Sequence, residues 1–358
     1  MIKGKYLHIT EDDRMDCQNQ ANQNRNGIAV AGNLIVDLVK NITAYPAMGM
    51  LTNIYDISQG VGGCAANTAV DLAKLDPDLP LCVLGRIGND DSGRFVTQTL
   101  ERYGLATDRV KVSDSEPTSF TDVMSLPSGE RTFFHKRGAN AAFSPADIDL
   151  DTLACDVFHI GYILLLDAFD QEDPEYGTVM ARFLCELQAR GIKTSIDIVS
   201  SDDLDAYEKK IVPALRYTDY VIINEVEACG IWHLEPRLPD GSIHKENVRT
   251  AMCKIAEAGT REKVVVHAKE MGFCLDVATG RMTELPSLKL NPADIKGSVG
   301  AGDAFCAGSL YALYHQYDDE KLLSFASAVA ATSLFEANAT DGIRPWREVL
   351  EIAETYQR

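Results

Sequence analysis

An acidic residue follows a glycine-rich turn at the start of a predicted helix, near the carboxyl end of the chain. Gly300, Ala301 and Gly302 precede Asp303, and small and apolar residues follow. Glycines before a helix leave backbone N–H groups free to hold an anion, and the helix dipole favours negative charge there. A carboxylate at the same point can take a proton from a hydroxyl group. The segment therefore indicates phosphoryl transfer, and the alternative is that Asp303 only caps the helix.

A second glycine-rich segment, 60–67, opens another predicted helix. The spacing Gly60-x-Gly62-x-x-Ala65 matches a dinucleotide-binding fingerprint, but no clear buried strand precedes it and the next strand is not followed by a ribose-binding acid. We interpret Gly62 and Gly63 as a place where a polar ligand approaches the backbone, with Asn67 as a side-chain donor. A tight loop entering a helix is the structural alternative. Because the sequence contains no P-loop, an ATP-using enzyme must hold phosphate differently.

A third pair of polar residues, Asn224 and Glu227, follows a predicted buried strand. If a helix starts there, the two side chains face one direction. Oxygen ligands suit Mg²⁺, which usually keeps several waters. The alternative is a helix cap followed by a solvated glutamate.

Short apolar stretches alternate with helical stretches along most of the chain. The predicted strands are 27–32, 81–84, 157–160, 194–198, 220–223, 263–267 and 273–277. The predicted helices are 65–75, 93–103, 176–190, 248–258, 303–314 and 321–335. Such alternation predicts an α/β fold with a mainly parallel sheet covered by helices on both faces. Ligands are then expected at the carboxyl ends of the strands.

Two segments, 37–59 and 117–137, interrupt this alternation and resemble hairpins. We predict that they pair into a small β-sheet, either a lid over the site or a dimer contact. Residues 1–26 form a polar N-terminal extension, and residues 27–358 form one main domain.

The composition excludes several classes of partner. The net charge of −19 argues against nucleic acid and against an anionic membrane surface. No apolar run reaches the roughly 18–20 residues of a membrane span. The 9 cysteines include no C-x-x-C pair, which predicts reduced thiols and a cytoplasmic protein.

Five segments, taken in order, resemble the ribokinase (PfkB) family of carbohydrate kinases. They read GVGGCAANTAVDLAKL, GRIGNDDSGRFVTQTLERYGL, RGANAAFSP, DYVIINEVEA and GSVGAGDAFCAG. The resemblance covers Gly27 to the carboxyl terminus. It implies a three-layer sandwich with a mainly parallel central sheet and a small β-sheet lid. It also implies an ATP-dependent kinase that phosphorylates a hydroxyl of a small sugar or sugar derivative.

The resemblance further implies roles for individual residues. Asp303 would be the general base, and the N–H groups of residues 300–302 would form the anion hole. Asn224 and Glu227 match a motif that orders Mg²⁺ and the nucleotide phosphates, largely through water. The residues expected at the sugar are Asp37, Gly62, Gly63, Asn67 and Asn140. A homodimer formed lid on lid is also implied.

Three departures from the family pattern carry further expectations. Gly297 stands where the family often has an aspartate of a cation site, so we expect no potassium requirement. His267-Ala268-Lys269 replaces a common Thr-x-Gly, so nucleotide contacts differ, and Lys269 either reaches a phosphate or is solvated. Ile35 replaces an asparagine of ribose-specific members, so ribose is disfavoured.

Other functions remain open at this point. One is a nucleoside kinase of the same fold. Another is a phosphosugar kinase, whose substrate phosphate would contact Arg131, Lys136 or Arg137, unless these only solvate the lid. A catalytically silent sugar- or nucleotide-binding regulator would lack the base, whereas Asp303 is present. A dinucleotide oxidoreductase is disfavoured by the imperfect fingerprint.

Overall fold

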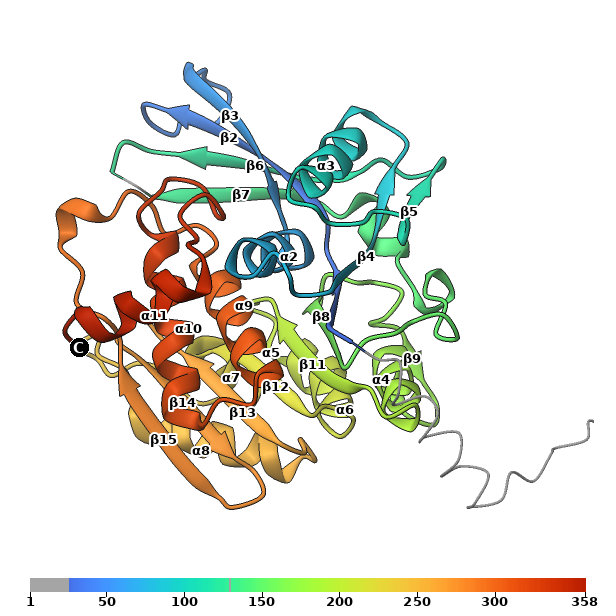
Figure 1. The fold of residues 1–358 in the computed structure, drawn as a ribbon. Coiled ribbons are helices and arrows are strands. Elements are labelled where there is room, and N and C mark those ends of the chain that lie inside the picture. Colours follow the sequence, from blue (N-terminus) through green and yellow to red (C-terminus); the bar gives the residue numbers. More distant parts are fainter. Residues whose placement is uncertain (1–25, 129) are drawn as a thin grey trace, which may run out of the picture.

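Nine strands form the central sheet, in the order β15-β14-β13-β12-β11-β8-β1-β4-β5 (Figure 1). The computed structural model describes residues 26–128 and 130–358. The strands are β1 (Ile28–Gly32), β4 (Leu81–Gly88), β5 (Val110–Ser113), β8 (Val157–Ile163), β11 (Lys193–Ile198), β12 (Tyr220–Asn224), β13 (Lys263–His267), β14 (Met271–Asp276) and β15 (Arg281–Pro286). Pairing is parallel from β13 through to β5, so the predicted mainly parallel sheet is confirmed.

The strands are apolar because both faces of the sheet are covered. In β1, Ile28 and Val30 pack into one hydrophobic core, whereas Ala29 and Ala31 pack into the other. At one side of the sheet, β14 runs antiparallel to β13 and the edge strand β15 runs antiparallel to β14. The connection 268–270 between β13 and β14 is too short for the crossover that parallel strands need.

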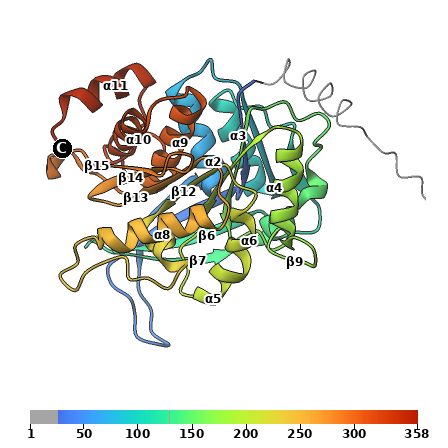
Figure 2. The same ribbon diagram turned by 90° about the horizontal axis from the view of Figure 1, so that it is seen from below.

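Helices form a layer on each face of the sheet (Figure 2). One layer holds α2 (Cys64–Leu75), α3 (Asp91–Arg102), α9 (Ala301–Tyr314), α10 (Asp319–Ser333) and α11 (Trp346–Thr355). The other holds α4 (Val179–Ala189), α5 (Leu204–Ala206), α6 (Val212–Leu215), α7 (Glu225–Gly230) and α8 (Lys245–Glu257). Short connecting elements are β9 (Glu172–Asp173), β10 (Gly177–Thr178), η1 (Gly138–Ala142), η2 (Pro145–Asp147), η3 (Tyr207–Ile211) and η4 (Pro292–Asp294).

Helix α9 is enclosed over most of its length. Every residue from Asp303 to Ala312 is buried. Small side chains let α10 approach closely, since a Cβ on Gly308 would lie 2.8 Å from the Cα of Ala326. The core therefore anchors α9 from Asp303 onward, while Ala301 and Gly302 at its start stay partly open.

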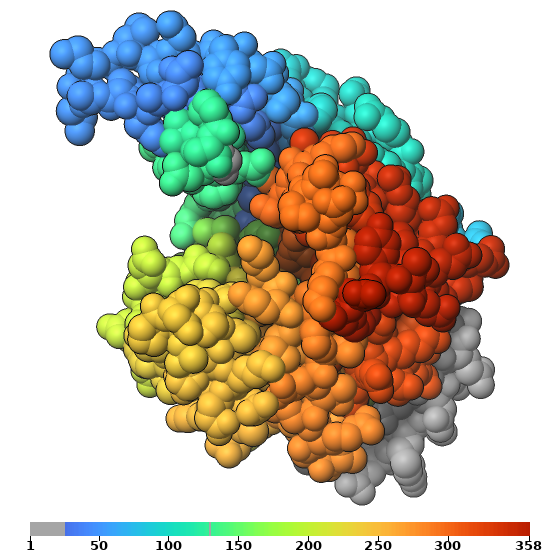
Figure 3. Space-filling view, turned by 90° about the vertical axis from the view of Figure 1, so that its left-hand side faces the viewer, coloured from blue at the N-terminus to red at the C-terminus, as the bar shows by residue number. Residues whose placement is uncertain are grey.

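A separate four-stranded sheet stands off this body, and we call it the lid. It comprises β2 (Ile35–Ile42), β3 (Ile54–Gly62), β6 (Ser119–Ser125) and β7 (Arg131–Lys136), in the order β3-β2-β6-β7. Strands β2 and β6 are parallel, whereas the two outer pairings are antiparallel. In Figure 3 the lid overhangs a hollow that the body closes from below. The predicted α/β architecture with a small second sheet is confirmed.

Two predictions concern other parts of the chain. Residues 1–25 of the predicted N-terminal extension lie outside the described residues. Within the described part, no helix has both the length and the apolarity needed to cross a bilayer. Seven of the described cysteines are free thiols, namely Cys64, Cys82, Cys185, Cys229, Cys253, Cys274 and Cys306.

Candidate active site

The start of α9 presents backbone donors without a side-chain cap. Gly300 adopts φ 74° at the N-cap, and its carbonyl accepts the first helical hydrogen bond, from Ala304 N at 2.8 Å. The first N–H groups of a helix, here those of Ala301 and Gly302, have no partner within the helix. A Cβ on Gly300 would lie 2.5 Å from that of Ala339, so this tight turn requires glycine. The geometry leaves a positive helix end available to an anion.

Asp303 lies in the first turn of α9 with its carboxylate held at both oxygens. Asn67 Nδ2 donates to Oδ2 at 2.7 Å, and the Tyr162 hydroxyl donates to Oδ1 at 2.8 Å. Asp303 is only 6% exposed. Burial raises the pKa of this carboxyl, while the two hydrogen bonds lower it by a smaller amount. The result is an oriented carboxylate with raised basicity, beside free backbone donors.

Tyr162 was not found by sequence reasoning. It lies in β8, and its backbone N–H donates to Asn33 Oδ1 at 3.0 Å, which fixes the strand beside β1. No motif marks this tyrosine. Its only signal is a place near the carboxyl end of a buried strand, where parallel sheets gather their ligands.

Asp197 is a second residue that the sequence analysis did not single out. It lies at the carboxyl end of β11 and is 9% exposed. Burial, together with the charges of Glu227 and Asp303, raises its pKa well above the usual range. An aspartate between two isoleucines at the end of a buried strand was the available signal.

Asn224 and Glu227 form a capping box at the start of α7. Asn224 Oδ1 accepts from Glu227 N at 2.9 Å, and Glu227 Oε2 accepts from Asn224 N at 3.0 Å. Glu227 Oε1 accepts from the Ser200 hydroxyl at 2.8 Å. The alternative of a cap was therefore right, but Glu227 is 5% exposed and not solvated. Burial raises its pKa to about 7.

These carboxylates are a donor set that fits Mg²⁺ held through water. Two buried acids, Asp197 and Glu227, repel one another, and a cation beside them would relieve that repulsion. Both oxygens of Glu227 already accept hydrogen bonds. Among the described residues, no group of three acidic, histidine or cysteine side chains forms a direct metal cage. Mg²⁺ readily keeps its waters in such a setting.

A cavity of about 680 Å³ opens on one side of the α9 start. Polar residues line one part, among them Asn224, Ser298 and Lys269. Apolar residues line another part, namely Leu288, Leu290, Ile295, Ala330, Ala331 and Leu334. This division suits a ligand with a flat apolar end and an anionic end.

His267 lies in that cavity, next to the glycine turn. Its ring packs against Phe305 at a tilt of 33°, with centroids 4.8 Å apart, and its Cε1 would be 3.5 Å from a Cβ on Gly302. Burial lowers the pKa of His267 to about 4. The imidazole is therefore neutral near pH 7 and can offer a hydrogen bond but no charge.

Asp37, in β2 of the lid, faces the other side of the α9 start. A Cβ on Gly62 would lie 2.1 Å from Asp37 Oδ2, so the carboxylate rests against this glycine. Gly63 has φ 85°, and its Cβ would meet the carbonyl oxygen of Asn33 at 2.3 Å. Burial raises the pKa of Asp37 to about 6, and the nearby Asp303 charge adds to this. Both carboxylates therefore border the hollow beneath the lid.

Asn140 is bound to the backbone rather than directed at this hollow. Its Nδ2 donates to Leu34 O at 3.1 Å, and its Oδ1 accepts from Leu34 N at 3.2 Å. The residue is fully buried. Asn140 thus braces the junction between β1 and β2 and orients the strand that carries Asp37.

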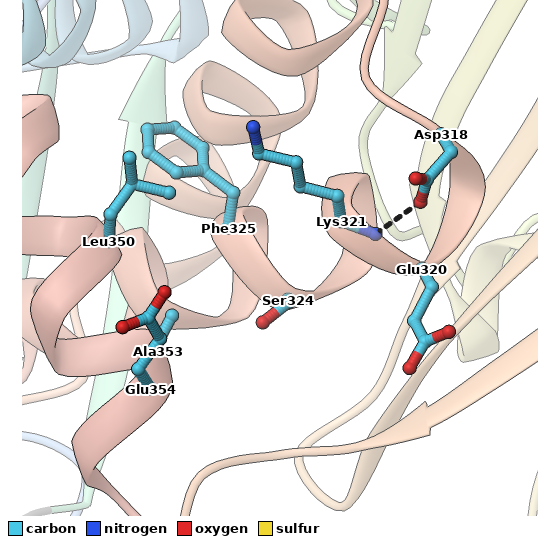
Figure 4. Close-up of a pocket in the computed structure, with 8 residues that line it drawn as sticks. All are labelled: Asp318, Glu320, Lys321, Ser324, Phe325, Leu350, Ala353 and Glu354. Carbon is cyan, nitrogen blue, oxygen red and sulfur yellow. Dashed lines mark hydrogen bonds between the residues drawn. The ribbon is translucent and has the colours of Figure 1, made fainter.

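A separate surface hollow lies between α10 and α11 (Figure 4). It is lined by Asp318, Glu320, Lys321, Ser324, Phe325, Leu350, Ala353 and Glu354. Asp318 Oδ1 accepts from Lys321 N at 2.9 Å, which is a helix cap. None of the residues predicted to act on substrate lies there, so this hollow is no part of the candidate site.

Comparison with known proteins gives a consistent set of similarities. A family model described as pfkB family carbohydrate kinase matches residues 25–347. A ribokinase of Schizosaccharomyces pombe is 23% identical over 330 residues, covering 90% of this chain and 96% of the relative. A 5-dehydro-2-deoxygluconokinase of Shouchella clausii is 24% identical over 311 residues, which cover 82% of this chain and 86% of the relative. The structure of Arabidopsis thaliana ribokinase complexed with ribose and ATP superposes with a TM-score of 0.75 at 20% identity. The superposition covers 92% of this chain and 99% of the ribokinase chain.

Proposed function

Because this chain belongs to the pfkB family of carbohydrate kinases, we propose that it transfers the terminal phosphate of ATP to a hydroxyl of a small sugar or sugar derivative. One observation carries the proposal: the Asp303 carboxylate stands beside uncapped N–H groups, between a nucleotide-sized cavity and the hollow beneath the lid. Asp37 then binds acceptor hydroxyls, and Gly62 and Gly63 let the acceptor approach the backbone.

The transfer follows from this arrangement. Asp303 takes the proton of the acceptor hydroxyl as its oxygen bonds to the terminal phosphorus and the bond to the ADP oxygen breaks. The N–H groups of Gly300, Ala301 and Gly302, aided by the α9 dipole, stabilise charge on the transferring phosphoryl group. Asn67 and Tyr162 keep the base oriented throughout.

The nucleotide occupies the 680 Å³ cavity, with its base against the apolar residues and its phosphates toward α9. Lys269 and the neutral His267 contact the phosphates in place of the family's usual residues. Mg²⁺, when bound, neutralises phosphate charge. Asn224, Glu227 and Asp197 would hold it, through water.

Two further features belong to this proposal. We expect the reaction in the cytoplasm, because free thiols such as Cys64, Cys82 and Cys229 suit a reducing compartment. We also expect no potassium requirement, because Gly297 lies between Lys296 and Ser298 without a carboxylate to hold a cation.

Replacing Asp303 tests the mechanism directly. Asp303→Asn removes the base but keeps a side chain of similar size, so kcat should fall by roughly 10²–10⁴-fold. Binding of ATP and of the acceptor, measured by calorimetry, should change only a few-fold. A matched control is Asp318→Asn, at the start of α10, which should leave kcat unchanged. A near-wild-type kcat for Asp303→Asn would mean that this residue is only a cap.

The acceptor class is found by an ATP-turnover screen at fixed Mg²⁺. Sugars, sugar acids, sugar phosphates and nucleosides are compared at equal concentration by ADP release. Turnover of at least one sugar or sugar derivative is expected. Turnover of nucleosides alone would replace the proposal with a nucleoside kinase.

A further inference from the structure

Strand β7 turns one basic side chain toward the hollow beneath the lid. Arg131 pairs with Ser125 of β6, and His135 pairs with Thr121 of the same strand. Thr121 in turn pairs with Asp37 of β2. Side chains of directly paired residues lie on the same face of a sheet, and residues two apart along a strand share that face. Arg131 and His135 therefore lie on the face that carries Asp37.

The two other basic residues at this end of the lid, Lys136 and Arg137, do not face the hollow. Lys136 pairs with Phe120, so it lies on the opposite face, and it is exposed. Arg137 forms an ion pair with Asp167 at 2.5 Å and donates to Leu164 O at 2.9 Å. These contacts tie Arg137 to the body of the protein. Of the three candidates raised by the sequence, only Arg131 faces the hollow.

Arg131 is half-buried, yet its guanidinium forms no direct salt bridge with any described residue. Across residues 26–128 and 130–358, none of the ion pairs or side-chain hydrogen bonds involves its guanidinium, although Lys40 and Arg137 of the same region are both paired. The charge it acts on is Asp37, whose pKa it lowers. A guanidinium offers five donors in a planar fork that matches carboxylate and phosphate.

The remaining charges of the hollow are negative. Asp37, Asp303 and Asp197 border it or lie just beneath it. His135 adds no positive charge near pH 7, because burial and the neighbouring Arg137 lower its pKa. Its Nδ1 lies 3.1 Å from the Thr121 hydroxyl, so it supplies hydrogen bonds. A neutral polyol has no need of a guanidinium here, whereas an anion could not enter this acidic hollow without one.

We propose that the acceptor is an anionic sugar derivative, a sugar acid or a sugar phosphate, whose charged group is bound by Arg131 while its hydroxyls contact Asp37. The inference rests on the proposed phosphotransfer, and it adds the class of acceptor. The anionic group sits toward the free end of the lid, because Arg131 is the first residue of β7 and Asp37 lies near the base of β2. The reacting hydroxyl is then at the opposite end, beside Asp303.

The test compares acceptors that differ in charge alone. Wild-type enzyme is assayed with an aldonic acid against the matching neutral alditol, and with a sugar phosphate against the parent sugar. The charged member of at least one pair should have the higher kcat/KM, by about 10–100-fold, as expected for a charge-assisted contact. Which pair responds identifies the charged group as carboxylate or phosphate.

Two variants assign the effect to its residue. Arg131→Gln should raise KM for the charged acceptor by a similar factor, leaving KM for ATP and for the neutral acceptor within about two-fold. Arg131→Lys should restore part of the preference. Lys136→Gln, on the same strand but the opposite face, should match wild type. Calorimetric binding of the charged acceptor gives the same comparison without turnover.

The outcomes separate this inference from the proposed function. Wild-type turnover of neutral sugars with no gain from added charge would overturn the inference and leave the kinase intact. An equal effect of Arg131→Gln on charged and neutral acceptors would also overturn it, because Arg131 would then be structural. No turnover of any sugar derivative would reject the proposed function itself.

Discussion

Asp37 is a carboxyl group whose burial links acceptor binding to stability. Its pKa is raised to about 6 from an ordinary value of 3.8. A carboxyl whose pKa is higher in the folded protein favours folding below its unfolded pKa, and this contribution is lost as the pH rises through the folded pKa. The ionised group that binds hydroxyls near neutral pH is therefore the destabilising form. The ionised Asp37 thus lowers the stability of the unliganded protein and, in the proposed function, strengthens the contact with the acceptor.

Replacing this group should change how stability depends on pH. The side chain of Asp37→Asn cannot titrate, so the variant avoids the stability that wild type loses as Asp37 ionises. The free energy of unfolding of the variant minus that of wild type should therefore increase by about 2 kcal/mol from pH 4.5 to pH 7.5. Urea denaturation of the two proteins at both pH values measures the difference. A constant difference across this range would show that the Asp37 carboxyl is not buried in the unliganded protein. The variant should also have a raised KM for the acceptor and an ordinary KM for ATP.

At the scale of elements, the start of α9 combines the base and the phosphate donors in one rigid helix end. The two glycines of that turn have different constraints. Gly300 needs its left-handed conformation and has no room for a Cβ, whereas a Cβ on Gly302 meets only the edge of His267, at 3.5 Å. Gly300 is therefore needed for the backbone conformation of the turn, whereas Gly302 keeps the space in front of the helix free for a ligand.

Alanine at each position should separate these roles. Gly300→Ala should lower the melting temperature markedly, because a left-handed alanine costs about 1–2 kcal/mol and its methyl overlaps Ala339. Gly302→Ala should keep or slightly raise the melting temperature, since alanine favours a helix by about 1 kcal/mol. Its methyl nevertheless projects into the nucleotide cavity, so KM for ATP should rise several-fold. An unchanged KM would place the phosphates elsewhere.

For the whole molecule, the lid presents apolar side chains that the body does not cover. Ile57 is 62% exposed and Phe134 55%, and Leu51, in the connection between β2 and β3, is 83% exposed. Exposed apolar groups gathered in this way usually mark a contact surface. A homodimer formed lid on lid is therefore the expected assembly in solution.

Light scattering at micromolar concentration tests this assembly. Wild type should have the mass of a dimer, and Ile57→Asp should shift it toward the monomer. A control is Val112→Asp, which alters an equally exposed apolar residue at the far edge of the central sheet. A wild-type monomer with full activity would reject the dimer and leave the catalytic proposal standing.

The sequence predicted those parts of the fold and site that depend on local pattern. Alternating strands and helices were visible in the apolar stretches, and the glycine turn before Asp303 identified the helix end. Asp197 and Tyr162 escaped notice because their proximity to Asp303 follows from strand order in the sheet. The alternative of a solvated Glu227 is wrong, and the sequence could not show that this carboxylate is buried and accepts from Ser200 of a different connection. Asn140 matched a motif, but its backbone contacts could only be seen in three dimensions.

The stretch of chain from Ile54 to Leu75 runs without a break from the lid to the helix that contacts the proposed general base, Asp303. Strand β3 ends at Gly62, α2 begins at Cys64, and Asn67 in the first turn of α2 holds the Asp303 carboxylate. A shift of β3 would thus reach the Asp303 carboxylate through the backbone of α2 and the hydrogen bond from Asn67. When no acceptor is bound, no ligand contacts the lid from below. We therefore expect hydrolysis of ATP by water to be slow until an acceptor binds.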